Sequence, residues 1–233
     1  MNKLRQLTLD LLIKDYATFA NFIVGDNTHP LEVMRLLSTK TGPFFLCFYG
    51  KTGVGKSHLL QALCQDFISV GNVPIYLSLC DRIKFTPEIL QDLSQCDLIA
   101  IDDIEAICGD LLWEEQLLHC FNQTMAAGKK LVISSSMVPQ LLTMQLPDLK
   151  SRLIGGGLVL PLYPLDDAAK VAALQLRAQF RGIELDTTVA NFLIARCDRS
   201  TTSLFTLLDR LDQASLVAQR RLTIPFVKDV LFT

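Results

Sequence analysis

The chain has 233 residues, of which 50% are hydrophobic and 20% charged, a composition typical of globular proteins rather than of disordered or fibrous ones. Its 22 basic side chains are nearly balanced by 24 acidic ones, for a formal net charge of −2. This balance argues against binding of duplex DNA through the overall electrostatic field, although it permits a local basic patch.

The seven cysteines are odd in number and form no C-x-x-C pair, which indicates reduced thiols in a cytosolic protein. The first residues lack the apolar core of a signal peptide. No apolar run approaches the ~20 residues that cross a bilayer. We therefore expect a cytoplasmic protein without membrane contact.

The N-terminal segment alternates polar and apolar residues from Gln6 to Leu11. The alternation fits an edge strand, and it fits equally well an extended peptide that places alternate leucines in the pockets of a partner. We expect residues 1–14 to form a tail, and the pattern alone leaves both interpretations open.

Five short apolar runs alternate with longer helical patterns over residues 15–164. Nearly unbroken apolar runs of this length are typical of strands buried on both faces of a parallel sheet. Their alternation with helices predicts an α/β three-layer sandwich with a five-stranded parallel sheet. The runs cover residues 44–49, 74–79, 98–101, 131–134 and 158–162, and the clearest helices cover 56–70 and 113–127.

A phosphate-binding loop follows the first run. The motif G-x-x-x-x-G-K-[ST] is matched in full, directly after a predicted strand and before a predicted helix, which is the context that it requires. Backbone N–H groups and the helix N-terminus attract phosphate, Lys56 reaches the β- and γ-phosphates, and Ser57 binds Mg²⁺. The motif consists of Gly50, Lys51, Thr52, Gly53, Val54, Gly55, Lys56 and Ser57.

Two acids end the third run. Asp102 is predicted to hold Mg²⁺, directly or through water, as the second acidic element of P-loop proteins does. Asp103 stands where a carboxylate that activates water belongs, but an Asp is shorter than a Glu, so its catalytic role stays open. Three serines, Ser134–Ser136, follow the fourth run; one of them can contact the γ-phosphate, and the sequence does not select which.

An arginine, Arg152, precedes the glycine turn Gly155–Gly157 and the last strand. From this position it can face the nucleotide of a neighbouring subunit and stabilise charge that develops on a transferred phosphoryl group. A surface arginine or an ion-pair partner is the alternative that composition favours.

The pattern becomes purely helical after Pro164. Asp166 and Asp186 are suited to cap two helices, the first ending at Gly182. A third helix is predicted from about Thr201 to Gln219 and a fourth from near Pro225. Residues 165–233 therefore form a small helical domain.

The order of these elements resembles the AAA+ part of the bacterial replication initiator DnaA over roughly residues 15–233. The resemblance is carried by the P-loop with its following residues 58–60, by Ile101–Ile104 and by Leu149–Arg152. It implies that Phe22, Val24 and Asn27 line the adenine pocket, and that His58 belongs to the nucleotide site.

Two further stretches, Ile107–Glu114 and Leu222–Lys228, resemble the Hda family of DnaA regulatory inactivators. So does the N-terminal peptide, which is similar to the Q-L-x-L-x-L peptides that bind the polymerase III beta sliding clamp. The similarity implies that this chain would bind the clamp through Gln6, Leu7, Leu9 and Leu11. Nothing after Phe226 is expected to form the DNA-binding domain of an initiator.

The resemblance implies a negative regulator of replication initiation. Such a protein docks on the DNA-loaded clamp, meets DNA only through it, and presents Arg152 as an arginine finger to ATP bound by DnaA. It acts with bound ADP or ATP and Mg²⁺, and a homo-oligomer is compatible with this action.

One departure concerns the third lid helix. AAA+ lids usually begin this helix with an arginine, whereas Ser200–Ser203 occupy the region here and Arg199 is the nearest arginine. We therefore expect weak intrinsic hydrolysis. An autonomous ATPase such as a helicase loader, and an initiator-like DNA-binding protein, remain as alternative functions.

Overall fold

The computed structural model describes residues 17–39, 42–91 and 93–232. The predicted tail, with Gln6, Leu7, Leu9 and Leu11, lies outside the described residues. The chain divides into two compact units. The first comprises the described residues within 1–20, 29–50 and 56–162, and the second comprises residues 21–28, 51–55 and 163–233. Residues 21–28 and 51–55, which the sequence placed in the nucleotide-binding domain, thus group by their contacts with residues 163–233.

A five-stranded sheet forms the centre of the first unit, with strand order β2-β3-β4-β1-β5. Every neighbouring pair is parallel, which confirms the predicted parallel sheet. The strands are β1 (Phe45–Tyr49), β2 (Pro74–Ser78), β3 (Leu98–Asp102), β4 (Lys130–Ser135) and β5 (Leu158–Pro161).

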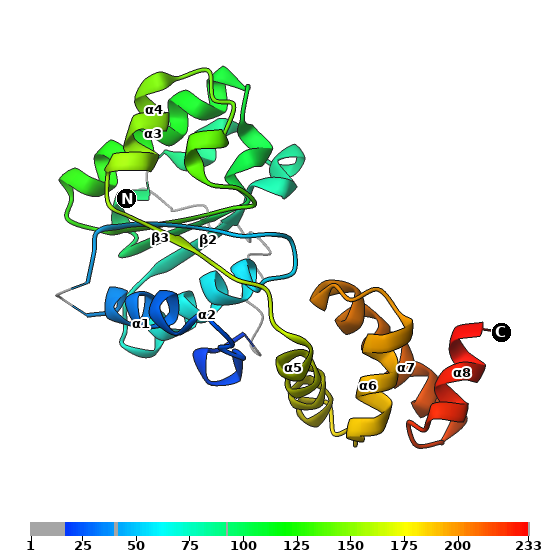
Figure 1. Ribbon diagram of the computed structural model, residues 1–233. Coiled ribbons are helices and arrows are strands. Elements are labelled where there is room, and N and C mark those ends of the chain that lie inside the picture. The colour runs from blue at the N-terminus through cyan, green and yellow to red at the C-terminus, as the bar shows by residue number, and fades with distance from the viewer. Residues whose placement is uncertain (1–16, 40–41, 92, 233) are drawn as a thin grey trace, which may run out of the picture. The chain divides into compact units, whose positions relative to one another are not determined.

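Helices cover both faces of this sheet, with α1 and α2 on one side and α3 and α4 on the other (Figure 1). The central strands are buried along their whole length because both faces are covered, and this explains why they read as unbroken apolar runs. The helices are α1 (Thr28–Leu37), α2 (Lys56–Ser69), α3 (Leu111–Ala126) and α4 (Pro147–Gly155).

Short 3₁₀ helices connect several of these elements. Two of them flank the end of β3: η2 follows β2, and η5 follows the two acids. They are η1 (Phe19–Asn21), η2 (Leu79–Lys84), η3 (Pro87–Leu90), η4 (Leu93–Gln95), η5 (Ile104–Ile107) and η6 (Pro139–Leu141).

The second unit contains four helices of the C-terminal region, as predicted. Asp166 and Asp186 cap the first two, and their carboxylates accept hydrogen bonds from Ala169 N at 2.7 Å and Thr188 N at 2.8 Å. Buried leucines and Phe226 form the core. The helices are α5 (Asp167–Phe180), α6 (Thr187–Arg196), α7 (Thr201–Ala218) and α8 (Ile224–Phe232).

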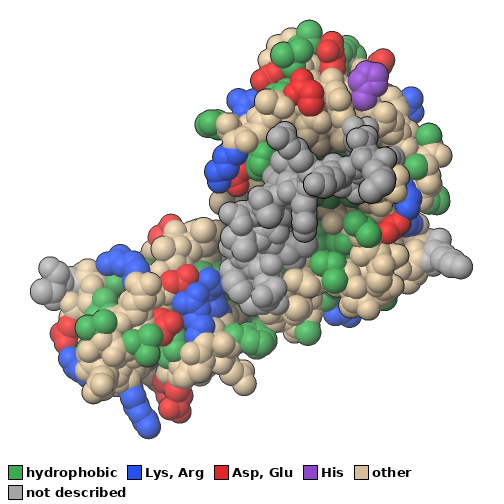
Figure 2. Space-filling model, turned by 180° about the vertical axis from the view of Figure 1, so that it is seen from behind, with side chains coloured by type: hydrophobic (Ala, Val, Ile, Leu, Met, Phe, Trp, Pro, Cys, Tyr) green, Lys and Arg blue, Asp and Glu red, His purple; other side chains and the backbone are tan. Residues whose placement is uncertain are grey.

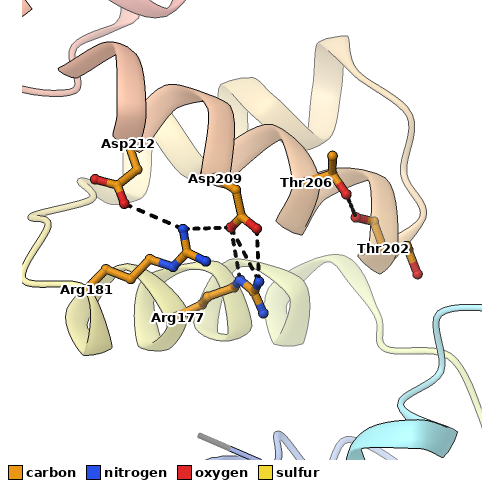
Figure 3. A network of polar contacts seen from close by, with 6 residues as sticks. All are labelled: Arg177, Arg181, Thr202, Thr206, Asp209 and Asp212. Atoms are coloured by element: carbon orange, nitrogen blue, oxygen red, sulfur yellow. Dashed lines mark hydrogen bonds and ion pairs between the residues drawn. The ribbon is translucent and has the colours of Figure 1, made fainter. Parts of the chain in front are cut away.

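A surface network joins α5 to α7 above this core (Figure 3). Arg177 and Arg181 of α5 both contact Asp209 of α7, at 3.2 and 2.9 Å, and Arg181 also reaches Asp212 at 3.5 Å. Arg177 in addition lies over the ring of Phe205, with 4.6 Å between the guanidinium carbon and the ring centroid. The network therefore ties the two helices together at their solvent-facing side.

Within the part of the chain that the structure describes, none of the helices has the length and apolar character needed to span a lipid bilayer.

Candidate nucleotide-binding site

The P-loop connects β1 to α2, as the sequence predicted. Gly50 N donates to Ser135 O at 3.0 Å, which anchors the start of the loop to the neighbouring strand β4. Gly53 and Gly55 have φ values of +85° and +101°, a region that L-residues with a side chain rarely adopt. The glycines thus allow the turn that directs successive N–H groups toward an anion at the start of α2.

The functional side chains of the loop lie at the first turn of α2. Lys56 is only 7% exposed, and its Nζ donates to the loop carbonyl of Gly50 at 2.9 Å. Ser57 is exposed. The ring of His58 lies 3.0 Å from Thr18 O, so the imidazole holds a neighbouring segment against α2. Lys56 and Ser57 are therefore placed where the motif requires them.

Asp102 is buried at the carboxyl end of β3, with 1% of its surface exposed. Its carboxylate accepts hydrogen bonds from Tyr76 Oη at 2.8 Å and from the Ser134 hydroxyl. Burial, followed by the charge of Asp102, raises the pKa of Tyr76 and keeps its hydroxyl a donor. Because β2 and β4 are the two neighbours of β3, each contributes one donor that fixes the acid.

Asp103 follows with a left-handed backbone, at φ 58° and ψ 56°. Its N–H donates to Ser134 Oγ at 3.0 Å, and its Oδ2 accepts from the Cys80 thiol at 3.3 Å. Burial, and next the charge of Asp102, raise the pKa of the Asp103 carboxyl. A raised pKa makes a carboxylate a stronger proton acceptor, which agrees with the predicted role in activating water. That catalytic role of Asp103 stays a prediction.

The three serines at the end of β4 are now distinguishable. The Ser134 hydroxyl is occupied by Asp102 and by the backbone of Asp103. Ser135 is fully buried and its Oγ accepts from Met137 N at 3.3 Å. Ser136 is partly exposed, and its N–H donates to Glu105 Oε1 at 3.0 Å. Ser134 therefore positions the two acids, which leaves Ser135 and Ser136 as candidates to contact phosphate.

The oxygens of Asp102 and Ser57 have the chemistry that Mg²⁺ prefers, since this cation binds few protein oxygens and keeps several waters and phosphate oxygens. Among the described residues no group of three or more His, Cys, Asp or Glu side chains forms a metal site of its own. The two hydroxyls on Asp102 leave it further lone pairs. The chemistry of these residues therefore fits a Mg²⁺ ion that would arrive with a nucleotide and be held by Asp102 directly or through water.

The segment predicted to line the adenine pocket belongs to the second unit. Phe22 is buried and lies against the P-loop: a Cβ at Gly55 would be 2.7 Å from Phe22 Cε2. Asn27 is 0% exposed, and its amide pairs on both sides with the backbone of Tyr163, at 2.9 and 2.7 Å. Asn27 therefore ties this segment to the backbone of Tyr163, and its place in an adenine pocket stays a prediction. Val24 is partly exposed and accepts from Asn27 N at 2.9 Å.

The start of α7 reaches the same loop. A Cβ at Gly53 would lie 3.2 Å from Thr202 Oγ1 and 3.5 Å from Thr202 N. A threonine therefore stands at the start of the third lid helix, where AAA+ lids usually have an arginine. Arg199 lies 3.8 Å from Asp167 of α5, which engages it within the helical unit. Neither observation supplies a cation from α7 to the loop.

Arg152 lies inside α4, which continues to Gly155, the first residue of the predicted glycine turn. The neighbouring Leu149 and Leu153 are 0% exposed and face the core, whereas Arg152 is exposed. Within the described residues its guanidinium is in none of the ion pairs. The arginine is therefore held on a helix with its head group toward solvent.

Three polar residues of this region escaped the sequence reasoning: Tyr76, Cys80 and Glu105. Tyr76 and Cys80 carry no motif, and only the pairing of β2 with β3 brings them to the two acids. Glu105 belongs to the acid-rich stretch after β3, which was a usable signal. Its Oε1 accepts from Ser136 N, and its Oε2 is buried without a hydrogen-bond partner among the described residues.

Comparison with known proteins agrees with this geometry. The family model of the Hda lid domain matches residues 167–231, and that of the bacterial DnaA ATPase domain matches residues 78–160. Domain III of the Thermotoga maritima replication initiation protein DnaA is 24% identical, with 93% of this chain and 95% of that chain covered and a TM-score of 0.80.

Two other solved structures are also similar. DnaA from Aquifex aeolicus with bound AMPPCP is 24% identical, with 84% of this chain and 65% of that chain covered and a TM-score of 0.71. The Holliday junction branch migration motor RuvB of Thermotoga maritima is 15% identical, with 86% and 65% covered and a TM-score of 0.64. The five-stranded parallel sheet, the P-loop and the two family matches together show that the chain is an AAA+ protein related to DnaA and Hda, with a helical lid of the Hda type.

Proposed function

We propose that this DnaA-related protein is a negative regulator of replication initiation that stimulates ATP hydrolysis by the initiator DnaA. In this proposal it docks on the DNA-loaded polymerase III beta sliding clamp and inserts Arg152 beside the ATP of the initiator. Hydrolysis then leaves the initiator in its ADP form. The observation that carries the proposal is Arg152 on α4, exposed and in no ion pair with the described residues, in a chain whose lid matches the Hda family.

The chemistry required of Arg152 is charge stabilisation. A guanidinium supplied by a second protein neutralises charge that develops on the transferred phosphoryl group, and such arginines are worth about 10³–10⁵ in rate. An exposed arginine is available for this role, because no carboxylate of the described residues has to be displaced from it. Its backbone is held by a buried helix face, which limits the positions that the head group can take.

The chain's own nucleotide has a different role in this proposal. The loop amides, Lys56 and Ser57 bind the phosphates of ADP or ATP, and Mg²⁺, when bound, screens the phosphate charge beside Asp102. ADP is favoured as the working ligand because Thr202, and not a cation, lies at the loop. Bound nucleotide thus stabilises the protein rather than being turned over rapidly.

The partners follow from the tail and from the charge distribution. Gln6, Leu7, Leu9 and Leu11 fit the pockets of the clamp, by the similarity of their pattern to clamp-binding peptides. Acidic and basic side chains are interspersed over the face seen in Figure 2. Contact with DNA is proposed only through the clamp, because a formal net charge of −2 gives no overall attraction to DNA.

The test is a reconstituted hydrolysis assay with ATP-bound initiator, DNA-loaded clamp and variants of this protein. Arg152→Ala is expected to lose stimulation, by about 10³-fold or more, and to keep ADP binding and clamp binding. Arg152→Lys restores little, because one ammonium lacks the planar fork of donors. Deletion of residues 1–11 is expected to remove clamp binding, and with it the stimulation on loaded clamps, and to leave ADP binding intact. Full stimulation by Arg152→Ala contradicts the proposal.

An autonomous ATPase such as a helicase loader is the second candidate. The complete P-loop and the raised pKa of Asp103 favour it, since a general base of higher pKa accepts a proton from water more readily. Steady-state phosphate release by the isolated protein separates the two functions. Turnover well below the 1–100 s⁻¹ typical of kinases agrees with the regulatory function, and rapid turnover without a partner favours the autonomous enzyme.

A further inference from the structure

A buried carboxylate, Glu114, lies on α3 beneath the helix that carries Arg152. It is 0% exposed, and its two oxygens accept hydrogen bonds from two separate loops. Oε1 accepts from Gly109 N at 2.8 Å, and Oε2 accepts from Leu146 N at 2.8 Å. A buried carboxylate is costly unless it is hydrogen-bonded in this way, so these two contacts constrain the chain around Glu114.

One of these bonds fixes the beginning of α4. Leu146 is the N-cap residue of α4, and Pro147 begins the helix. A second contact supports the first: Gln145 Nε2 donates to Gly109 O at 2.5 Å. Glu114 therefore holds the loop after η5 and the first turn of α4 at one point of α3.

The other end of α4 also rests on α3. Gly156, the C-cap of α4, donates its N–H to Arg152 O at 2.8 Å. A Cβ at Gly156 would be 2.7 Å from Phe121 Cζ, so the backbone there lies directly on the ring. Glu114 and Phe121 are seven residues apart, which is about two helical turns and the same face of α3.

The two contacts hold a short helix at both of its ends. The apolar contacts of Leu149 and Leu153 keep α4 on the core, but apolar contacts are not directional and allow small rotations and shifts. Hydrogen bonds to a charged group are directional and about twice as strong as neutral ones. Arg152 lies six residues beyond Leu146, about 9 Å along the helix at 1.5 Å per residue, so a tilt at the first turn displaces its backbone.

We propose that Glu114 is a positioning residue for Arg152: together with the Phe121–Gly156 contact, it sets the place of α4 on α3 and thereby the reach of the guanidinium into the partner's nucleotide site. The inference rests on the proposed function of Arg152. It predicts a loss of rate rather than of binding, because displacement of a catalytic group by about 1 Å can lower a rate about 10²-fold.

Two substitutions test the contacts that hold α4 on α3, each with a matched control. Glu114→Gln keeps the shape but turns one acceptor into a donor that faces an N–H, whereas Glu115→Gln changes the exposed neighbour on the same helix. Gly156→Ala places a methyl group 2.5 Å from Arg152 O and 2.7 Å from Phe121 Cζ, so it shifts the C-terminal end of α4 on α3. A Cβ at Gly155 meets nothing within 4 Å, so Gly155→Ala is its control. ADP affinity of each variant shows whether it is folded.

The readout is the rate of ATP hydrolysis by the initiator as a function of the concentration of each variant on DNA-loaded clamps. Glu114→Gln and Gly156→Ala are expected to lower the maximal rate about tenfold or more, with the half-saturating concentration and ADP affinity unchanged. Both controls keep the wild-type maximum. In the Arg152→Ala background Glu114→Gln should add no further loss, because it acts through the arginine.

The outcomes separate the inference from the proposed function. Equal maximal rates for Glu114→Gln and Glu115→Gln, with Arg152→Ala inactive, overturn the positioning role and leave the finger intact. Full stimulation by Arg152→Ala overturns both. If Glu114→Gln does not bind ADP, Gly156→Ala against Gly155→Ala decides by the same criteria, and a wild-type maximum for Gly156→Ala then overturns the inference.

Discussion

The two units of the molecule use polar side chains in opposite ways. In the sheet unit, the carboxylate of Asp102 is buried and accepts hydrogen bonds from Tyr76 and Ser134 at the ends of adjacent strands. In the helical lid, Asp209 meets Arg177 and Arg181 at the surface, where its side chain is 37% exposed (Figure 3). A buried polar group is costly unless it is satisfied, whereas a surface ion pair contributes little.

The difference indicates what each unit is built for. The sheet unit keeps the carboxylate of Asp102 out of water at the end of β3, in the place proposed for the cation of a nucleotide. The lid is held by an apolar core of leucines, and its surface charges steady two helices. Changes in the lid should therefore affect stability more than chemistry, and changes at the strand ends and the P-loop should do the reverse.

The largest expected effect breaks the lid core. Leu208 of α7 is 0% exposed, and Leu208→Ala should lower the free energy of unfolding of the lid by about 2–5 kcal/mol, as for other buried leucines. Trp113, the one tryptophan of the chain, lies in the sheet unit. Urea unfolding followed by its fluorescence should then stay near wild type while helicity is lost at lower urea.

The control for this substitution lies on the same helix. Leu216 is 72% exposed, so Leu216→Ala should leave both transitions unchanged. A joint shift of fluorescence and helicity in Leu208→Ala would show that the two units unfold as one, against the separation drawn here.

The next effect concerns chemistry without stability. Lys56→Ala removes the ammonium that the P-loop offers to phosphate, and ADP affinity measured by calorimetry should fall about 100-fold, since charged hydrogen bonds contribute roughly 1.5–3 kcal/mol. The melting temperature without nucleotide should change little. Lys84→Ala, at an exposed lysine, serves as the control, and an unchanged ADP affinity in Lys56→Ala would refute the assignment of the loop.

A smaller effect is expected at Gly53, where the loop meets Thr202. Gly53→Ala combines a left-handed φ with a Cβ 3.2 Å from Thr202 Oγ1, and we expect an ADP affinity about tenfold lower, since the strain is about 1–2 kcal/mol. Gly128 has a φ of +64° with nothing within 4 Å of its Cβ. Gly128→Ala should therefore lower stability but not ADP affinity. Equal losses of ADP affinity in the two variants would mean that the contact of Gly53 with Thr202 does not matter for binding.

The smallest effect tests the surface network. Asp209→Asn weakens the pairs with Arg177 and Arg181, and the lid should lose less than about 1 kcal/mol of stability, since exposed pairs contribute 0.2–1 kcal/mol each. The loss should shrink as salt is raised, because salt screens exposed charges. Asp81→Asn, which breaks an exposed pair of the sheet unit, should leave the stability of the lid unchanged. A loss of several kcal/mol of stability that salt does not alter would mean that these ion pairs behave as buried pairs.

The amino-acid sequence by itself determined the local elements. The strands were predictable because burial on both faces demands unbroken apolar runs, and the P-loop because its glycines and Lys56 follow a fixed spacing. Asp166 and Asp186 cap their helices as predicted, since a cap bonds to an N–H only two or three residues away. All these signals are contained in short stretches of chain.

Only the tertiary structure decided which distant groups meet. The order of the strands places Tyr76 and Ser134 on either side of Asp102, and this order is not written in any single strand. Asn27 forms hydrogen bonds with the backbone of Tyr163, 136 residues away. Glu114 accepts one from Leu146 N, 32 residues away. Such partners depend on how the elements pack, because a hydrogen bond needs two atoms within about 3 Å, a distance that local periodicity does not specify.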